Sequence, residues 1–420
     1  MLKKITLMAV LLAAVFSSTL LAAEWDQLGL AGRIVYSLTV NPADSQNIYA
    51  GTDAGLYVTI NGGSSWNVKI ASNVIIPDVA FAPLATDSVF ALVSGGSFSD
   101  GLYYSTDNGL TWDTVANYSN PRRMTFDAVN AGFMYICFGD GILKSQNYGI
   151  NVSDANQGLP DTNIIDVLAD GANGLEAYAV GDTFLSHTIN FGNSWTDIPG
   201  QFSIPGHAPS RIAYDPHEPG TIYVVSDHYF AYSPNRGIFW NYTEMPTYNN
   251  SPIVCDPDHV GFIYVGSIGE GVLRSVDGGS SFASVNNGLG NLSVYSLAIG
   301  PNGYLYAGTG DGVFEIDLAT VGIEDNYEYL PRAVEIMRNY PNPFNSRTVI
   351  ELNLADNEYG KVEIFDLAGG LVRTLFEGRG QQRLIWDGTD NAHQPVASGI
   401  YFYKLTTDSR SVAKRLTLLK

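Results

Sequence analysis

The sequence predicts an all-β protein, a seven-bladed β-propeller followed by a small immunoglobulin-like (Ig-like) β-sandwich. Three observations point to this fold class: a motif that recurs about every 43 residues, 44 glycines, and a charged-residue content of 15%. Chains of this composition form short strands joined by tight turns, whereas helix-rich chains carry more Lys, Glu and Arg. A repeat of about 43 residues has the length of one four-stranded propeller blade.

Residues 1–23 are expected to form a signal peptide. Lys3 and Lys4 precede an apolar run over residues 5–21, and Ala23 is a small residue suited to cleavage. The alternative is a membrane anchor, but Ser and Thr weaken the run and no charged stop-transfer segment follows it. No other segment is apolar enough to cross a bilayer, so we expect no membrane insertion after cleavage.

The rest of the chain divides by charge and composition. Residues 24–320, the expected propeller, carry 8 Lys and Arg against 29 Asp and Glu, a net charge of −21. Residues 321–335 are expected to form a polar linker, and residues 336–420, the expected sandwich, have a net charge of +2. A propeller this acidic repels phosphate backbones and anionic lipids, so we expect no nucleic-acid partner.

The recurring motif reads Ser/Thr-x-Asp/Asn-x-Gly-x-x-aromatic. We expect its Asp or Asn to cap a turn, its Gly to adopt a positive φ, and its aromatic side chain to fill the space between blades. The Asp or Asn positions, which lie 46, 40, 43, 45 and 42 residues apart, are Asn61, Asp107, Asn147, Asn190, Asn235 and Asp277. These segments resemble the Asp-box, the bacterial neuraminidase repeat of sialidases, sortilin-type receptors and photosystem-assembly propellers. The resemblance implies a structural role for the motif.

The last repeat is incomplete. Residues 294–318 supply three strands but no motif, and residues 25–30 precede the first inner strand much as a motif loop would. We expect this N-terminal segment to add the missing outer strand, because pairing the two ends closes the ring and removes exposed sheet edges.

The C-terminal segment contains five motifs in a fixed order. Its apolar strands alternate with Gly and Asp turns, which predicts a sandwich. The motifs begin at Asn339, Gly360, Leu384, Val396 and Lys414. In this order they resemble the type A C-terminal sorting domain of the bacterial type IX secretion system. The resemblance implies the secretion machinery as a partner and export across both membranes to the cell surface or extracellular space; an ordinary accessory sandwich is the alternative.

Candidate ligand-binding residues come from the inner strands. Propellers bind ligands at the mouth of the central channel, where these strands begin. The residues aligned at this position are Ser37, Asp78, Arg123, Asp166, Arg211, Pro252 and Ser296. Four consecutive repeats thus contribute Asp, Arg, Asp and Arg, and we expect Arg33 and Arg122 nearby. Two interpretations remain open: ion pairs between blades, or a polar or anionic ligand held by the arginines.

An acidic residue also occupies the turn between the second and third strands of every repeat. These residues are Asp53, Asp100, Asp140, Asp182, Asp227, Glu270 and Asp311. Turn chemistry explains most of them, because Asp before Gly is a favoured turn pair. No calcium-loop pattern and no zinc-ligand spacing occur, so we expect no metal and no cofactor. Cys137 and Cys255 lie three repeats apart, too far to form a disulfide.

The leading hypothesis is a secreted or surface-attached, non-catalytic binding propeller whose ligand is a polysaccharide, peptide or protein, with no catalytic residue assigned. The alternatives are a glycan-active hydrolase and a scaffold for extracellular assembly. Arg33, Arg123 and Arg211 could mimic the arginine triad of sialidases, but Val35 stands where the sialidase motif has Pro, and sialidases have six blades. Xyloglucan-hydrolysing relatives use two propellers, and this chain has one.

Overall fold

The computed structural model describes residues 23–71, 73–95, 100–171, 174–198, 208–238, 240–321, 338–352, 359–380, 382–407 and 411–420. These residues form strands and turns, and none of them lies in a helix. Within these ranges no helix has the length and apolar character needed to span a membrane. Residues 1–22 of the expected signal peptide and residues 322–335 of the expected linker lie outside the described residues.

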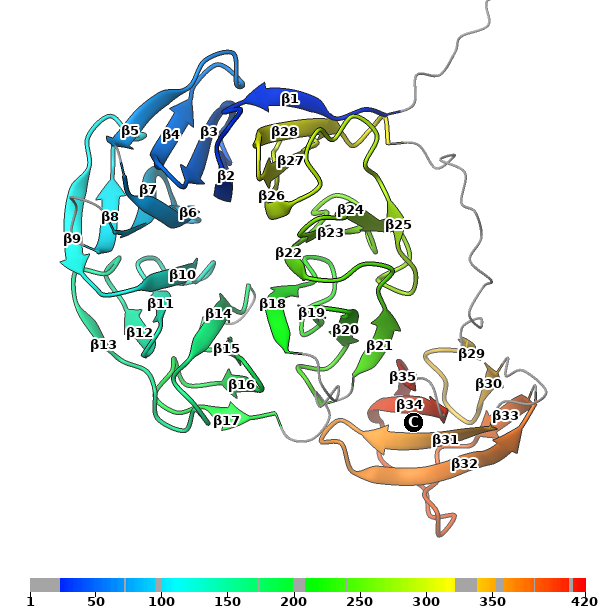
Figure 1. Cartoon of the computed structure of the whole chain (residues 1–420). Helices are drawn as coiled ribbons and strands as arrows, with labels where there is room; N and C mark the ends of the chain where they lie inside the picture. Colours follow the sequence, from blue (N-terminus) through cyan, green and yellow to red (C-terminus); the bar gives the residue numbers. More distant parts are fainter. Residues whose placement is uncertain are drawn as a thin grey trace, which may run out of the picture.

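Among the described residues, seven four-stranded antiparallel sheets surround a central axis, each with one strand innermost (Figure 1). We number the sheets from the first, β2–β5, to the seventh, which combines β26–β28 with β1. From the innermost to the outermost strand they are β2 (Val35–Asn41), β3 (Asp44–Thr52), β4 (Gly55–Thr59) and β5 (Asn67–Ala71); β6 (Ile75–Ala82), β7 (Ala85–Ser94), β8 (Gly101–Ser105) and β9 (Asp113–Asn117); β10 (Pro121–Phe126), β11 (Met134–Phe138), β12 (Gly141–Ser145) and β13 (Val152–Asp154); β14 (Ile164–Ala169), β15 (Ala177–Gly181), β16 (Leu185–Thr188) and β17 (Thr196–Asp197); β18 (Pro209–Tyr214), β19 (Ile222–Ser226), β20 (Tyr229–Ser233) and β21 (Asn241–Glu244); β22 (Asn250–Cys255), β23 (Ile263–Ser267), β24 (Gly271–Ser275) and β25 (Ala283–Ser284); and β26 (Val294–Ile299), β27 (Tyr304–Thr309), β28 (Gly312–Asp317) and β1 (Asp26–Gly29).

The second strand of each sheet is apolar along most of its length, because neighbouring sheets cover both of its faces. β11, β15, β19 and β23 are buried at every position. The buried side chains form clusters that join one sheet to the next. One cluster unites Tyr49 of the first sheet with Val79 of the second, and another unites Tyr178 of the fourth with Trp240 of the fifth. Packing between sheets therefore builds the core.

The two ends of the propeller chain close the ring, as the sequence predicts. β1 pairs antiparallel with β28, with Asp26 opposite Glu315. Trp25, which is 2% exposed, packs against Tyr264 and Leu305. Its indole N–H donates a hydrogen bond of 2.5 Å to the carbonyl of Val285. The first sheet-forming residues of the chain are thus fixed to the sixth and seventh sheets.

Two side chains hold the motif turn in five of the six repeats, as far as the described residues show. In the second repeat, Asp107 Oδ1 accepts hydrogen bonds from the backbone N–H groups of Leu110 and Thr111, at 3.0 and 2.9 Å. Ser105 Oγ accepts a 2.8 Å bond from the N–H of Gly109, which has a φ of 76°. The Ser or Thr hydroxyl makes the same bond to the motif Gly in the other five repeats. The sequence predicts the Asp or Asn cap but not this second one.

Replacing Ser105 with alanine is expected to lower the free energy of unfolding by about 1–3 kcal/mol, because the buried N–H of Gly109 loses its acceptor. Urea denaturation of the purified protein measures the change. Thr106→Ala, at the exposed neighbouring position, is the matched control and should change stability by less than about 0.5 kcal/mol. Equal stabilities of the two variants would contradict the role of the hydroxyl.

The motif aromatics fill space between sheets, as predicted. Trp66 lies in a cluster with Leu28 and Val35, and its indole N–H donates to the carbonyl of Leu28 in the seventh sheet at 3.1 Å. Trp195 is buried and donates to the carbonyl of Ala155, which follows the third sheet, at 2.7 Å. These two motif turns therefore contribute to packing against the preceding sheet.

The C-terminal residues form two sheets with one shared core. The three-stranded sheet contains β29 (Arg338–Tyr340), β30 (Thr348–Leu352) and β33 (Gln382–Trp386), and the four-stranded sheet contains β32 (Leu371–Arg379), β31 (Tyr359–Asp366), β34 (Gly399–Thr407) and β35 (Ser411–Leu418). Trp386 and Ile350 of the first sheet pack against Ile364, Tyr403 and Leu416 of the second. The two sheets therefore form a sandwich.

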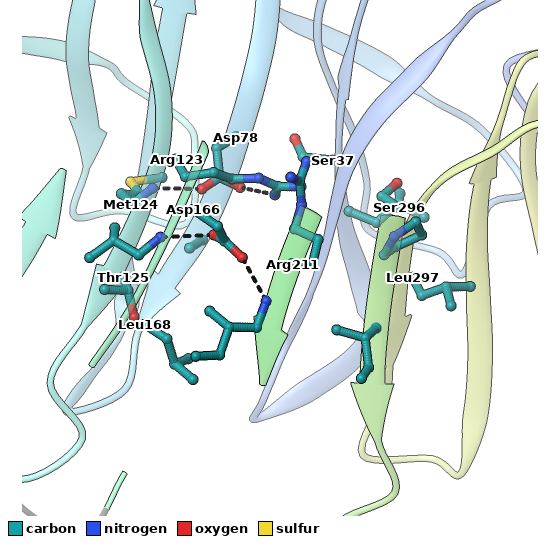
Figure 2. A pocket seen from close by; sticks show the side chains of 16 residues that line it. Ser37, Asp78, Arg123, Met124, Thr125, Asp166, Leu168, Arg211, Ser296 and Leu297 are labelled. Carbon is teal, nitrogen blue, oxygen red and sulfur yellow. Dashed lines mark hydrogen bonds and ion pairs between the residues drawn. The ribbon is translucent and has the colours of Figure 1, made fainter. Parts of the chain in front are cut away.

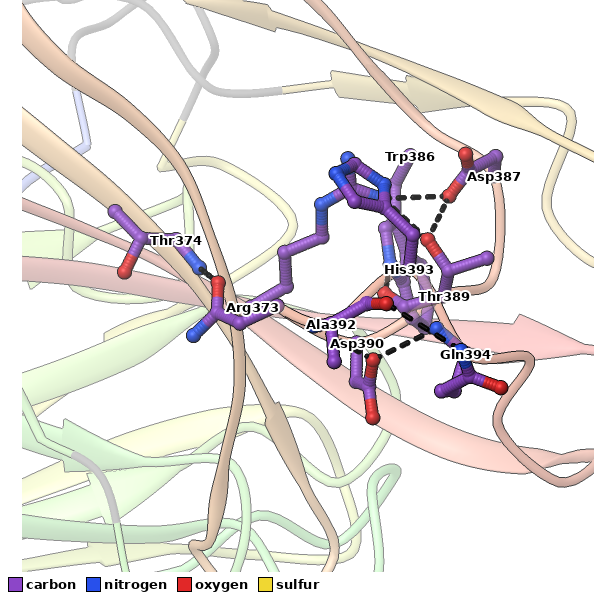
Figure 3. Close-up of polar contacts among 10 residues, drawn as sticks. Arg373, Thr374, Trp386, Asp387, Thr389, Asp390, Ala392, His393 and Gln394 are labelled. Carbon is purple, nitrogen blue, oxygen red and sulfur yellow. Dashed lines mark hydrogen bonds and ion pairs between the residues drawn. The ribbon is translucent and has the colours of Figure 1, made fainter.

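Arg373 holds the loop that follows β33 (Figure 3). Its guanidinium donates to Asp387 Oδ1 at 2.7 Å and to Thr389 Oγ1 at 2.5 Å, and the indole of Trp386 donates to the carbonyl of Thr389 at 2.9 Å. Burial acts to raise the pKa of Asp387, but the hydrogen bond from Thr389 and the charge of Arg373 outweigh it and lower the pKa. The loop is thus tied to β32 and to the core.

Candidate functional site

A cavity of about 220 Å³ lies at the centre of the ring, between the innermost strands (Figure 2). All seven residues that the sequence aligns at the start of these strands line it: Ser37, Asp78, Arg123, Asp166, Arg211, Pro252 and Ser296. They share one level of the channel because each inner strand enters its sheet in the same direction and register. The charged residues come from four neighbouring sheets, the second to the fifth.

Asp78 and Arg123 join the second sheet to the third. Arg123 Nη1 lies 3.2 Å from Asp78 Oδ1, and both side chains are largely buried, at 19% and 9% exposed. Asp78 Oδ2 also accepts a 2.9 Å hydrogen bond from the backbone N–H of Met124. Burial alone would lower the pKa of Arg123, but the charges of Asp78 and Asp166 outweigh it and raise the pKa. We call Asp78, Arg123, Asp166 and Arg211 together the charged ring. The pair of Asp78 and Arg123 fits the interpretation of ion pairs between blades.

Asp166 joins the fourth sheet to the fifth in the same way. Its Oδ2 accepts a 3.1 Å hydrogen bond from the N–H of Ile212, and its Oδ1 accepts one of 3.0 Å from its neighbour Val167. Burial raises the pKa of Asp166, against the opposing charges of Arg211 and Arg123. The backbone contact repeats that of Asp78, so both aspartates connect adjacent inner strands.

Arg211 differs from Arg123 in its contacts. Its Nη1 donates a 2.6 Å hydrogen bond to the carbonyl of Ser210, and its buried Nε has no hydrogen-bond partner within the described ranges. Burial and the nearby charge of Arg123 lower its pKa to about 10, so the guanidinium stays protonated at neutral pH. No carboxylate of the described residues comes within 4.0 Å of it. Arg211 is thus a cation in the channel without an ion-pair partner there.

The other two predicted arginines do not line the cavity. Arg122 lies at the irregularity in β10 between Pro121 and Arg123 and is not among the residues that line the cavity. Its Nη1 donates to Asn163 Oδ1 at 2.8 Å and to the carbonyl of Ile164 at 2.7 Å. Ile164 is the first residue of β14 in the fourth sheet, and Asn163 directly precedes it. Arg33 is exposed in the segment before β2. Sequence alignment placed these residues near the channel but did not indicate which way they point.

The seven acidic turn residues lie at the same end of the channel as the charged ring. In the first sheet, Val35 at the start of β2 pairs with Thr52 at the end of β3, so the turn that contains Asp53 is at the mouth. Some of these residues also cap turns: Asp100 Oδ1 accepts a 2.7 Å hydrogen bond from Gly95, and Asp311 Oδ1 accepts one from Gly32 at 2.5 Å. Turn chemistry therefore accounts for part of the acidic residues, as predicted.

Two further groups of residues bear on cofactor and redox chemistry. Within the described ranges no three or more His, Cys, Asp or Glu side chains are arranged to hold a metal ion. Cys137 and Cys255 are free. Burial raises the pKa of both thiols, that of Cys137 to about 12. Both thiols therefore stay protonated at neutral pH.

The C-terminal sandwich identifies the class of protein. Residues 338–418 match the family model of the secretion system C-terminal sorting domain. This domain is a sorting signal for type IX export, so the chain is exported to the cell surface or the extracellular space. The protein is therefore an exported β-propeller with a C-terminal sorting domain.

Its relatives share the propeller fold. A xyloglucanase of Hypocrea jecorina (strain QM6a) is 26% identical over 308 residues, 66% of this chain and 35% of the xyloglucanase, so the chain spans about a third of that enzyme. The structure of YCF48 bound to D1 peptide has a TM-score of 0.54 and 16% identity, and covers 71% of this chain and 97% of that one. The GH74 xyloglucanase of Xanthomonas campestris has a TM-score of 0.57 and 15% identity, over 92% and 74%.

Proposed function

We propose that the protein is an exported, non-catalytic binding propeller that takes a basic peptide with a free carboxylate into the mouth of its channel. The observation that carries this proposal is Arg211, a cavity-lining guanidinium whose recorded hydrogen bond goes to a carbonyl and not to a carboxylate. Arginine binds carboxylates through paired, charge-assisted hydrogen bonds. Arg123 is less suited to this role, because Asp78 already neutralises it.

The surroundings of Arg211 define the rest of the ligand. The seven acidic turn residues give the mouth a negative potential, which attracts Lys and Arg side chains and repels a purely anionic ligand. A ligand that matches both Arg211 and the acidic mouth carries positive charges outside the cavity and one carboxylate within it. A cavity of about 220 Å³ has room for a terminal residue but not for a folded domain. The structure of YCF48, which this chain covers almost completely, is of a peptide complex, and this supports a peptide over a polysaccharide.

A glycan-active hydrolase is the second candidate, favoured by the 26% identity to a xyloglucanase. Its chemistry needs two carboxyl groups free to protonate and to attack at the glycosidic bond. In the channel, both oxygens of Asp78 and both oxygens of Asp166 accept hydrogen bonds from the protein. Catalysis by this pair would break contacts between sheets, so the binding function is the better supported of the two.

Peptide binding tests the proposal. Fluorescence polarisation with short Lys-rich peptides should show binding when the C-terminus is free and at least about tenfold weaker binding when it is amidated. Arg211→Ala should weaken binding of the free form by a similar factor, because the buried guanidinium is lost. Arg33→Ala, which removes an exposed arginine outside the cavity, is the matched control and should leave the affinity unchanged.

Five outcomes would overturn the proposal. Equal affinity for free and amidated peptides would show that the protein does not recognise the terminal carboxylate. An Arg211→Ala variant with unchanged affinity would show that the peptide does not bind at Arg211. Binding of polysaccharides but not of peptides would show that the ligand is a polysaccharide. Release of reducing sugars from xyloglucan would favour the hydrolase. Binding of neither class by the folded protein would leave a scaffold for extracellular assembly.

We further infer the domain boundaries and the finer fold assignments. The seven four-stranded sheets support a complete seven-bladed propeller over residues 24–320. The recurring Ser/Thr and Asp/Asn caps support an Asp-box identity for the motif. The packed three- and four-stranded sheets support an Ig-like topology for residues 336–420, which the segment 321–335 joins to the propeller after removal of residues 1–23.

A further inference from the structure

The turn motifs share a feature besides their caps, because all six carry an aliphatic side chain at the second or sixth position. In five of the six motifs this side chain is exposed to solvent. These residues, with their exposed fractions, are Ile60 (70%), Leu110 (74%), Ile150 (68%), Ile189 (67%) and Val276 (37%). Exposed aliphatic residues that recur at one place in a repeat form apolar points around the rim of the propeller.

The fifth motif is the exception, and the C-terminal sandwich covers it. Ile238 occupies the same motif position as Leu110 and Ile150 but is only partly exposed. It packs against Phe402 and Ala413, which are 2% and 1% exposed. Figure 1 shows β34 and β35 next to β21 of the fifth sheet. The aliphatic side chain that the other repeats expose is thus part of an interface here.

This interface uses the outer face of the four-stranded sheet. Phe365, Phe402 and Ala413 lie on the face opposite the core of the sandwich, because the core takes the alternate residues of β31 and β34. At Gly369, which follows β31, an added Cβ would lie 3.0 Å from Ile238 Cγ2. An apolar patch on a sheet face that otherwise points to solvent therefore meets an apolar side chain of the propeller.

The propeller also satisfies the free edge of the sandwich. β35 is an edge strand, and its N–H groups that point away from β34 need other acceptors. The N–H of Thr417 donates to Asn342 Oδ1 within the sandwich at 2.8 Å. The N–H of Ala413 donates instead to Asn241 Oδ1 in the fifth sheet at 2.5 Å, and Asn241 is 4% exposed. Separation of the two domains would leave this edge N–H without its protein acceptor.

A charged pair lies beside this contact. Arg415 Nη2 is 4.0 Å from Glu218 Oε2 in the turn between β18 and β19, and both side chains are more than half exposed. An exposed pair of this kind adds little to stability, but it agrees in sign with a sandwich of net charge +2 on a propeller of net charge −21. Apolar packing, an edge hydrogen bond and charge therefore coincide at one repeat.

We propose that the fifth turn motif is a docking site for the sorting domain of the same chain. The propeller holds the sandwich through Ile238 and Asn241, and the three-stranded sheet of the sandwich stays uncovered for contact with the secretion machinery. The setting of the fifth motif fits this role, because Asn235 is the only one of the six motif Asp and Asn residues that is buried in the described structure.

Chemical cross-linking tests the docking. Glu218→Cys combined with Arg415→Cys puts two accessible thiols next to each other, and a short bismaleimide should join them within one chain. Cys137 is buried, and Cys255, which is partly exposed, is replaced by Ser in every variant so that only the two introduced thiols react. Adding Ile238→Asp should slow this cross-link about tenfold, because the two thiols lose the high effective concentration that docking provides. Ile150→Asp, at the same motif position of the third repeat, should leave the rate unchanged.

Two measurements decide the outcome. Thermal unfolding verifies that the Ile238→Asp propeller is folded, and small-angle scattering should give a larger radius of gyration for this variant than for the wild type and for Ile150→Asp. Equal cross-linking rates and equal radii in the two variants would overturn the proposal. Wild-type scattering from two separately moving domains would overturn it as well.

Discussion

Asp78→Ala is expected to destabilise the propeller by about 3–5 kcal/mol, because removal of one partner of a buried ion pair leaves the other charge uncompensated. Arg123 would keep its buried guanidinium but lose the carboxylate 3.2 Å away, and the N–H of Met124 would lose its 2.9 Å acceptor. Equilibrium denaturation in urea, followed by tryptophan fluorescence, measures the loss.

Two variants make this result specific. Asp113→Ala removes an exposed carboxylate from β9 of the same sheet and should change the free energy of unfolding by less than about 0.5 kcal/mol. Asp78→Ala combined with Arg123→Met should recover part of the lost stability, because no unpaired charge remains in the channel. A single variant as stable as Asp113→Ala would show that the charged ring does not connect the second and third sheets.

Trp25→Ala is expected to cost about 3–5 kcal/mol, because it removes a large buried side chain and leaves a cavity where the ring closes. Trp25 lies in the cluster of the sixth and seventh sheets, and its indole donates to Val285. The loss should be local in the first instance: hydrogen exchange at the amides of β28 should accelerate more than exchange at those of β11 on the far side of the ring.

The control for ring closure is Ile60→Ala. It removes an aliphatic side chain that is 70% exposed and should have little effect on the free energy of unfolding or on hydrogen exchange. Uniform acceleration of exchange around the ring in Trp25→Ala would contradict a closing role and would mean that the propeller opens as one unit.

Most of the propeller framework is predictable from sequence because its turns use local chemistry. The spacing of Asn61, Asp107 and their equivalents locates every turn, and the alignment of inner strands puts Asp78 and Arg211 in one cavity. Pairing of β1 with β28 also follows from the incomplete last repeat. Such features depend on residues a few positions apart, or on a repeat that the sequence displays directly.

The remaining features depend on contacts between residues that are far apart and outside the repeat. The sequence left two interpretations of the charged ring open, ion pairs between blades or a ligand held by the arginines. In the described structure Arg123 pairs with Asp78, whereas Arg211 does not pair with a carboxylate. The partners of Arg122 are Asn163 and the carbonyl of Ile164 at the start of the next sheet, and the contact between Ile238 and Phe402 joins two domains. The direction of a single side chain and the docking of two folded surfaces leave no periodic pattern in the sequence from which they could be predicted.

Closure of the ring has a consequence for the order of events during export. The indole of Trp25 and its acceptor, the carbonyl of Val285, are 260 residues apart, so the contact cannot form until almost the whole propeller has left the ribosome. Contacts at such separation form late because the chain must first be ordered in between. Until then β1 has no partner strand, because the strands of the seventh sheet are made last, and its unpaired edges invite pairing with other chains. The interval between the arrival of the first strand and that of the last is therefore the time at which this protein is most exposed to aggregation.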